Sequence, residues 1–200
     1  MGQWDGYRAH IHREPNGVRV LTKNGHDWTH KFTMIAEAAL ALTKTTYIMD
    51  GEIVMLDEQG APTSRSDFNL LVSSLGGRAG NRVAANAIFM AFDLFYQNGR
   101  DLRRMEYSSR RHILEQALKR STGAIRLSEE FDADPNILFR HACELELEGI
   151  IAKRTDAPHM PGRTGMAQVQ AVRYLPDRRI RTLELAWPAG KRSRSAGDQR

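Results

Sequence analysis

Residues 6–22 read GYRAHIHREPNGVRVLT, and this stretch decides the fold class. Apolar and polar side chains alternate from Gly6 to Arg13 and again from Val18 to Thr22, which is the period of a half-buried β-strand. Glu14-Pro15-Asn16-Gly17 separates the two runs with residues that favour turns. The stretch therefore predicts a β-hairpin with a four-residue turn.

Helical and strand patterns then follow without a strict β-α-β alternation. Phe32, Ile35, Ala36, Ala39 and Leu40 have the spacing of one helix face. The dipeptide Asp50-Gly51 is interpreted as a tight turn between two antiparallel strands. The expected elements after the first helix are strands Thr46–Met49, Glu52–Leu56 and Ala87–Tyr96 (central, closed by an Asn98-Gly99 turn), a short helix from a Ser66 cap to Leu75, a loop at 76–86, helices Glu106–Lys119 and Pro135–Leu147, and strands Ile150–Arg154, Gln168–Tyr174 and Thr182–Trp187. This mixture favours an α+β fold with a largely antiparallel sheet.

Composition places the chain among globular proteins. The 200 residues are 41% apolar and 26% charged, which suits one packed domain and excludes wholesale disorder. No apolar run approaches the roughly 18 residues of a membrane span, and the N-terminus lacks the order of a secretory signal. We therefore expect a cytoplasmic protein with no membrane partner. The single cysteine, Cys143, excludes an internal disulfide and is interpreted as a small core residue.

The net charge of +5 is concentrated at the C-terminal end, because residues 173–200 carry eight basic and three acidic groups. The basic groups are Arg173, Arg178, Arg179, Arg181, Lys191, Arg192, Arg194 and Arg200, of which all but the first and last are candidate phosphate contacts. Such an asymmetry is typical of a segment that binds a polyanion, and a solvated tail without a partner is the alternative.

Five short motifs occur in a fixed order along the chain. They are Trp4-Asp5-Gly6-Tyr7-Arg8, the run LTKNGHDW at 21–28, Asp50-Gly51-Glu52-Ile53-Val54, Ala91-Phe92-Asp93-Leu94, and the run EGIIAKR at 148–154. Each alone is compatible with an ordinary strand entry, turn or helix end. Together with the loop 156–165 they resemble the adenylation domain of ATP-dependent DNA ligases, most of all the ligase module of bacterial non-homologous end-joining ligases.

The resemblance covers about residues 1–175 and implies an α+β nucleotidyltransferase (ATP-grasp-like) adenylation fold, with mainly antiparallel sheets flanked by helices. Residues 176–200 would then be a basic segment at the start of an oligonucleotide-binding-fold domain. The implied cofactors are ATP and Mg²⁺, and the implied partners are nicked or broken duplex DNA and a repair protein. In this family a lysine attacks the α-phosphate of ATP, the adenylate passes to a 5′-phosphate of nicked DNA, and a 3′-hydroxyl displaces it.

Roles for single residues also follow from the matched motifs. Phe92 is expected to stack on adenine, Arg8 to lie near the ribose, and Glu52 to bind the ribose or a metal-held water. Lys23 stands where the family usually has an arginine, which keeps the charge but loses the planar fork. The implied nucleotide-binding residues are Asp5, Gly6, Arg8, Lys23, Glu52, Phe92, Lys153, Gln168 and Gln170, and the implied metal contacts are Glu148 and Glu52.

Glutamine replaces lysine at three positions of the family pattern. Gln3 stands three residues before Gly6, at the nucleophile of Lys-x-Asp-Gly-x-Arg, and its delocalised amide nitrogen cannot attack phosphorus. Gln168 and Gln170 stand at the Lys-x-Lys strand, whose i, i+2 spacing would put two amines on one face. Two charges that would stabilise the reacting phosphate are thereby lost.

We therefore expect a degenerate ligase with no catalytic residue and no self-adenylation. Because Met1 falls on the first motif, the expected protein is an N-terminally truncated adenylation domain. Two alternatives remain open. One is a non-catalytic nucleotide- or DNA-binding module that acts through a partner. The other is a relative of RNA ligases or capping guanylyltransferases, although the run at 21–28 favours DNA ligases.

Other candidate sites are weaker. His10 and His12 share a strand face, and His26 and His30 lie four apart, but no third metal ligand is in register with either pair. These histidines are interpreted as partly exposed residues. The aromatic residues Trp4, Trp28 and Phe95 are interpreted as core side chains.

Overall fold

The computed structural model describes residues 6–42, 45–55, 68–77, 80–119, 121, 123–130, 137, 140, 149–160 and 166–170. Their strands are β1 (Tyr7–Glu14), β2 (Gly17–Thr22), β3 (Tyr47–Met55), β4 (Ala87–Gln97), β5 (Arg100–Asp101), β6 (Ile125–Leu127), β7 (Gly149–Lys153) and β8 (Met166–Gln170). The helices are η1 (Thr29–Lys31), α1 (Thr33–Leu42), α2 (Phe68–Ser74) and α3 (Tyr107–Leu118).

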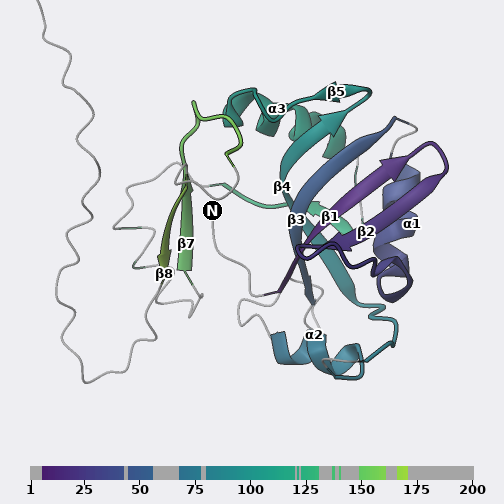
Figure 1. Ribbon diagram of the computed structural model, residues 1–200. Helices are drawn as coiled ribbons and strands as arrows, with labels where there is room; N and C mark the ends of the chain where they lie inside the picture. Colours follow the sequence, from purple (N-terminus) through teal and green to yellow (C-terminus); the bar gives the residue numbers. More distant parts are fainter. Residues whose placement is uncertain are drawn as a thin grey trace, which may run out of the picture.

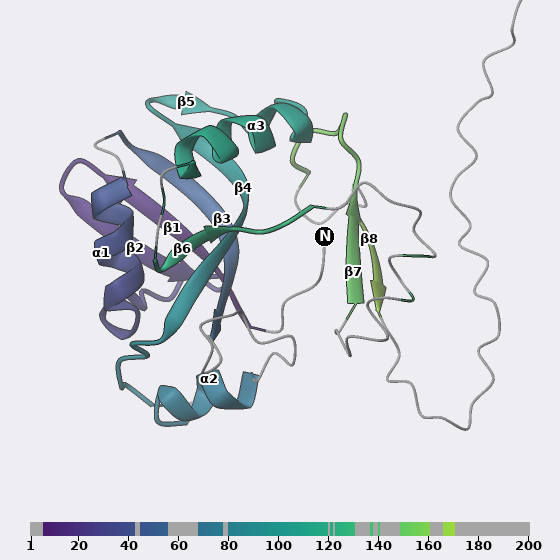
Figure 2. The same ribbon diagram turned by 180° about the vertical axis from the view of Figure 1, so that it is seen from behind.

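A six-stranded sheet forms the centre of the fold (Figure 1), with the order β2-β1-β3-β4-β5 and β6 paired to β4. All pairs are antiparallel except β4 with β6. Strands β7 and β8 form a separate antiparallel hairpin, which lies on the side of the large sheet away from α1 (Figure 2). The expected α+β fold with mainly antiparallel sheets is confirmed, and β4 is central as predicted.

The β1–β2 hairpin is confirmed with a tighter connection than the sequence predicts. Glu14 pairs directly with Gly17, so only Pro15 and Asn16 lie outside the ladder. The predicted Asn98-Gly99 turn is also present, and both residues have positive φ angles, 47° and 82°. Two successive left-handed residues match the right-handed twist of the strands that they join.

The predicted turn at Asp50-Gly51 is wrong, because both residues lie inside the continuous strand β3. Gly51 is needed there for close packing rather than for a turn. A Cβ atom at Gly51 would lie 2.4 Å from Cζ of Phe89 and 2.6 Å from the carbonyl oxygen of Met90. The glycine thus lets β3 and β4 approach each other in the middle of the sheet.

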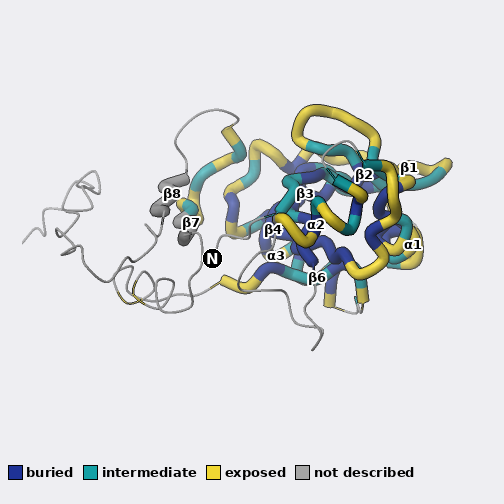
Figure 3. The backbone as a smooth tube through the Cα atoms, turned by 90° about the horizontal axis from the view of Figure 1, so that it is seen from below, coloured by how far each residue is buried: buried dark blue, intermediate teal, exposed yellow. Residues whose placement is uncertain are grey.

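The hydrophobic core lies between the sheet and α1. Ile11 and Val20 from the hairpin, Met49 and Phe89 from the central strands, and Ile35 from α1 are fully buried. Figure 3 shows buried segments along β3 and β4 and exposed segments along the outer side of α1. Leu40, which the helical pattern places on the apolar face, is 46% exposed. Leu40 instead lines an open pocket beside α1, together with Ala36 one turn earlier.

Strand β6 was not predicted from the sequence, because three residues are too short for a visible alternation. The predicted strand Gln168–Tyr174 begins earlier, at Met166, and is described only to Gln170. The structure does not describe Trp4, Ser66, Cys143 or the predicted strand Thr182–Trp187. Of the predicted helix Pro135–Leu147, it describes only residues 137 and 140. Within the part of the chain that the structure describes, no helix is long and apolar enough to cross a membrane.

Candidate active site

One face of the large sheet carries polar side chains instead of core residues. Alternation along β1 places Ala9 and Ile11 in the core and Arg8 and His10 on the opposite face. Strand β3 alternates in the same way, so Asp50 and Glu52 face the same side as Arg8. The polar residues of the two neighbouring strands therefore gather on the face away from α1.

Arg8 and Asp50 form a bidentate ion pair across these strands. The Arg8 guanidinium donates from Nε to Oδ1 at 3.1 Å and from Nη2 to Oδ2 at 2.6 Å. Nε2 of His10 lies 3.3 Å from the same Oδ1 atom. Burial of Asp50 disfavours its charged form, but the hydrogen bonds from His10 and Arg8 outweigh burial and hold the pKa of Asp50 below its usual value. Asp50 is 1% exposed, so it fixes the Arg8 guanidinium from within the sheet.

Two β-bulges aim aromatic rings of β4 at this polar face. Met49 pairs with Leu94 while Ile48 pairs with Tyr96, so Phe95 has no partner residue on β3. Gly51 pairs with Ala91 while Asp50 pairs with Asp93, which leaves Phe92 as the second extra residue. A bulge bends its strand and re-aims the extra side chain. The ring that the sequence predicts to stack on adenine therefore sits at an irregularity of the sheet.

Phe92 lies within contact distance of two cations. The guanidinium carbon of Arg8 is 5.5 Å from the centre of the Phe92 ring. Nζ of Lys153, which comes from the end of β7, is 4.5 Å from the same centre. Cations at such distances are attracted by the negative face of an aromatic ring. Residues from three distant motifs are thus brought together around one ring.

Lys153 also contacts Tyr107, the first residue of α3. Its Nζ lies 4.5 Å from the centre of the Tyr107 ring, 3.4 Å from the Tyr107 hydroxyl and 3.5 Å from the Phe92 carbonyl oxygen. The single proton of the Tyr107 hydroxyl is shared between two acceptors, the Phe92 carbonyl oxygen and the Glu130 carboxylate. Burial lowers the pKa of Lys153 to about 8, against the opposing attraction of nearby carboxylates. Burial and the Glu130 hydrogen bond raise the pKa of Tyr107, so its hydroxyl stays protonated.

A buried ion pair between Arg110 of α3 and Asp93 of β4 lies next to the site. Arg110 of α3 donates from Nε and Nη2 to the two carboxylate oxygens of Asp93, at 2.8 and 2.9 Å, and from Nη1 to the Met105 carbonyl at 2.6 Å. The side chains of Arg110 and Asp93 are only 3% and 6% exposed. Because Asp93 follows Phe92 directly, this pair ties the bulged part of β4 to α3.

A stack of rings extends the site along β4. The His10 ring meets the Phe95 ring edge to face, with their centres 5.7 Å apart. The centre of the His159 ring lies 4.2 Å from the centre of the same Phe95 ring. Burial lowers the pKa of His159 below its usual value. Phe95 is 7% exposed, so it is buried as interpreted, but it packs against His10 and His159 and is not part of the hydrophobic cluster beneath α1.

The structure brings some of the predicted site residues together. Arg8, Phe92 and Lys153 are in contact, and the backbone N–H of Lys23 donates to the Arg8 carbonyl at 3.0 Å while its side chain is exposed. Glu52 lies on the same sheet face and raises the pKa of Arg8, although less than the Asp50 hydrogen bond does.

Gly6 has a neighbour that the sequence does not predict. A Cβ atom at Gly6 would lie 2.1 Å from the carbonyl oxygen of Ile53 in β3. The residue must therefore be glycine because of the adjacent strand, in addition to any approach of a nucleotide.

Gln168 and Gln170 lie two residues apart on β8, opposite Ile151 and Gly149 of β7. Their register on β8 agrees with the predicted strand, and the orientation of the two side chains stays a prediction from the i, i+2 spacing. The other candidates, Gln3, Asp5, Glu148 and the six basic residues of the C-terminal segment (Arg178, Arg179, Arg181, Lys191, Arg192 and Arg194), lie outside the described residues.

The described side chains alone do not form a metal site. Among them, no group of three or more histidine, cysteine, aspartate or glutamate residues could hold an ion. His30 instead bonds to the Asn81 side chain at 2.6 Å, and His10 belongs to the Asp50 pair. His10 on β1 is half-buried and His30 in η1 is exposed, in line with their interpretation as partly exposed residues.

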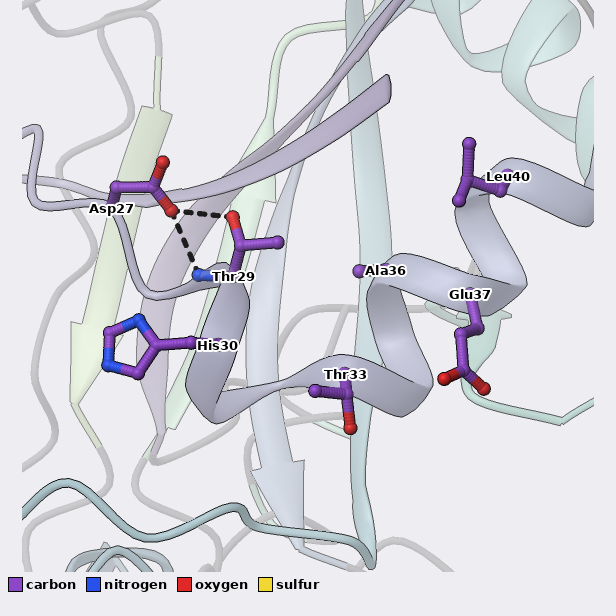
Figure 4. A pocket seen from close by; sticks show the side chains of 7 residues that line it. All are labelled: Asp27, Thr29, His30, Thr33, Ala36, Glu37 and Leu40. Carbon is purple, nitrogen blue, oxygen red and sulfur yellow. Dashed lines mark hydrogen bonds between the residues drawn. The ribbon is translucent and has the colours of Figure 1, made fainter. Parts of the chain in front are cut away.

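The open pocket beside α1 is not a convergent site. It has a volume of about 580 Å³ and is lined by Asp27, Thr29, His30, Thr33, Ala36, Glu37 and Leu40. Figure 4 shows that the Asp27 carboxylate is turned to Thr29, from which it accepts two hydrogen bonds, while the Glu37 carboxylate points away at the other end. The polar groups of this pocket therefore do not face a common point, unlike those around Phe92.

Sequence reasoning missed the residues that α3 contributes. Tyr107, Arg110 and Arg111 are buried on the same helix stripe as Leu114 and Leu118. Two arginines at buried positions of an apolar stripe require buried acceptors, and this pattern was the signal available in the sequence.

Comparisons with known proteins agree with the motif order. The family model described as the ATP dependent DNA ligase domain matches residues 3–169. The multifunctional non-homologous end joining protein LigD of Pseudomonas aeruginosa is 36% identical over 170 residues, which are 82% of this chain and 19% of that protein. LigD of Mycolicibacterium smegmatis is 30% identical over 200 residues, 98% of this chain and 24% of that protein.

Solved structures give the same relationship. The mycobacterial DNA ligase D complexed with ATP and MES has a TM-score of 0.66 and 31% identity, covering 85% of this chain and 53% of that one. The ligase domain of M. tuberculosis LigD has a TM-score of 0.68 and 29% identity, with the same coverage. The chain thus spans about a fifth to a quarter of the two LigD proteins and about half of the two solved chains.

Proposed function

Because this chain belongs to the ATP-dependent DNA ligase domain family, we propose that it is a ligase-type nucleotide-binding module that binds adenine nucleotides but does not charge itself with AMP. The convergence of Arg8, Phe92 and Lys153 is the observation that carries this proposal. An aromatic ring flanked by cations suits a ligand that combines a flat base with negative charge. Residues 1–175 form the adenylation unit, and residues 176–200 form a basic segment.

The site chemistry fits the nucleoside part of ATP better than the triphosphate. Phe92 supplies a surface for the base, and Arg8, fixed by Asp50, supplies a donor toward the ribose side. Toward the phosphates, Gln3, Gln168 and Gln170 offer amides where the family pattern has amines. Each lost charge-assisted hydrogen bond weakens binding by about 1.5–3 kcal/mol, so adenosine is expected to bind almost as well as ATP.

The loss of the nucleophile decides against self-adenylation. An amine must be neutral to attack phosphorus, and the resulting phosphoramidate must discharge to the 5′-phosphate of DNA. Gln3 has no such lone pair. Lys153 is held between Phe92 and Tyr107, so it does not replace the missing amine in this proposal.

Magnesium would be held by Glu52 together with Glu148. Carboxylate oxygens are the ligands that Mg²⁺ prefers, and a bound ion would neutralise phosphate charge. Glu52 is the member of this pair whose position the structure describes.

Duplex DNA with a nick or break is the proposed macromolecular ligand, together with a repair protein. The six arginine and lysine side chains of the C-terminal basic segment would contact phosphates without reading sequence. Cytoplasmic localisation belongs to the same proposal.

The deciding experiment is incubation of the chain with [α-³²P]ATP and magnesium, followed by denaturing electrophoresis. We expect no acid-labile, base-stable label on the natural sequence. The variant Gln3→Lys should label weakly, and Gln3→Lys with Gln168→Lys and Gln170→Lys should label more strongly, because residues that act as one unit do not contribute additively. A labelled natural chain would overturn the proposed loss of self-adenylation.

A further inference from the structure

The amine of Lys153 occupies the layer in which a base would stack on Phe92. Aromatic rings stack with their centres about 4.5–7 Å apart. Nζ of Lys153 is 4.5 Å from the Phe92 centre, within that layer. Phe92 is only 8% exposed, so its ring is covered.

The amine is held at this place by more than one group. The Tyr107 ring lies on its other side with the centre 4.5 Å away, and the Phe92 carbonyl and Tyr107 hydroxyl oxygens lie at 3.5 and 3.4 Å. Among the described residues, no carboxylate forms an ion pair with Lys153. The aromatic pair and two neutral oxygens are therefore its direct neighbours.

We propose that Lys153 is an internal plug of the base platform: its amine occupies the Phe92 face in the nucleotide-free chain and must leave before an adenine ring can stack there. The inference rests on the proposed adenine-stacking role of Phe92. It also reverses the sequence-based prediction for Lys153, because a plug lowers nucleotide affinity instead of raising it. A ligand that binds only the open state has its apparent affinity reduced by the fraction of molecules that are open.

The charge of Lys153 sets how firmly the plug is held. The groups that face it from neighbouring elements are Arg8 on β1, Asp50 on β3, Asp93 on β4, Tyr107 and Arg110 on α3, and Glu130 after β6. The carboxylates favour the charged amine, whereas burial disfavours it and brings the pKa to about 8. A neutral amine is attracted less strongly by the two rings, but it loses less hydration on burial, and the lowered pKa of Lys153 indicates that the loss of hydration is the larger effect. Because the pKa is lower in the plugged position than the ordinary value for lysine, the plug is expected to tighten as the pH rises through about 8.

Calorimetric titration of the full chain with adenosine tests the plug, because adenosine has no phosphate that a lysine could bind. We expect Lys153→Met to bind adenosine about tenfold more tightly than the natural chain at about pH 6.5, since a partly desolvated cation–π contact no longer competes. The natural chain should lose affinity between about pH 6.5 and about pH 9.5, and the Met variant should not.

Lys31→Met is the matched control. Nζ of Lys31 also lies 4.5 Å over an aromatic ring, that of Trp28, and donates to the Gly80 carbonyl, but it does not contact Phe92. This variant should leave adenosine affinity and its pH dependence unchanged. Lys153→Gln keeps a hydrogen-bond donor without a charge, and it serves as the second test variant where Lys153→Met fails to fold.

The outcomes separate the plug from the proposed function. Binding by the natural chain that is equal or tighter than binding by Lys153→Met and Lys153→Gln overturns the plug and leaves the Phe92 platform standing. Tight binding that persists in Phe92→Ala, or an absence of adenosine binding in every variant, overturns the platform and the plug together.

Discussion

Replacement of Asp50 by asparagine tests whether burial makes the Arg8 ion pair important. Asp50→Asn keeps the shape of the side chain but removes the charge that accepts two hydrogen bonds from Arg8. Hydrogen bonds to charged groups contribute about 1.5–3 kcal/mol and neutral ones about 0.5–1.5 kcal/mol, so two bonds predict a loss of about 2–3 kcal/mol. Because the Arg8 side chain is 37% exposed, solvent screens part of this interaction and we expect about 2 kcal/mol.

The free energy of unfolding is measured by urea titration with tryptophan fluorescence, supported by the melting temperature, which should fall by about 4–8 °C. Asp101→Asn is the control, since Asp101 pairs with Arg103 at the same 2.6 Å distance between Nη2 and Oδ2 but at the surface. The control should leave the unfolding free energy unchanged within error. Equal destabilisation by both substitutions would refute the argument from burial.

The pH dependence gives a second check on the same pair. The pKa of Asp50 is lower in the folded chain than its ordinary value of about 3.9, so the ionised carboxylate stabilises the fold above about pH 4. This contribution is lost as the pH falls through the lower pKa of the folded state. The stability difference between the natural chain and Asp50→Asn should therefore be constant near neutral pH and shrink in acid.

Three further outcomes are expected. Gly51→Ala should destabilise the fold by about 1–3 kcal/mol in urea titrations, because the added Cβ meets Phe89 at 2.4 Å; unchanged stability would show that the two strands can move apart. Phe92→Ala should abolish calorimetric adenosine binding, while the exposed control Lys119→Ala should not. Deletion of residues 188–200 should flatten the log–log salt dependence of nicked-duplex binding by roughly two to four units, and equal binding by full-length and truncated chains would mean that the tail has no DNA contact.

Local patterns predicted the fold well where they reported a single strand or helix. The hairpin and α1 have a clear period in the sequence, β4 is a continuous apolar run, and α3 was predicted over Glu106–Lys119; the structure contains all four at nearly the expected positions. Asp50-Gly51 failed because the same dipeptide suits a turn and a crowded strand interior. The difference depends on Phe89, which approaches from another strand, so it is not visible in a local window.

The candidate site was predicted by motif rather than by geometry. The motif order placed Arg8, Phe92 and Lys153 in one site, and the structure brings these three side chains together. It could not show that Lys153 lies on the Phe92 ring itself, because that contact depends on how β7 meets β4 and on the position of Tyr107. Nor could it show which carboxylate fixes Arg8, since Asp50 and Glu52 are both on the same face.

The two bulges of β4 also divide the central strand into regions of unequal exchange protection. At one end β4 is flanked by β3 and β6, with Ala91 its last residue paired to β6, and at the other end by β3 and β5, with Tyr96 its first residue paired to β5. Between these ends, Phe92 and Phe95 are absent from the described ladders on both sides. Amide hydrogens should thus exchange slowly near the ends of β4 and faster at the bulges, where opening requires no global unfolding.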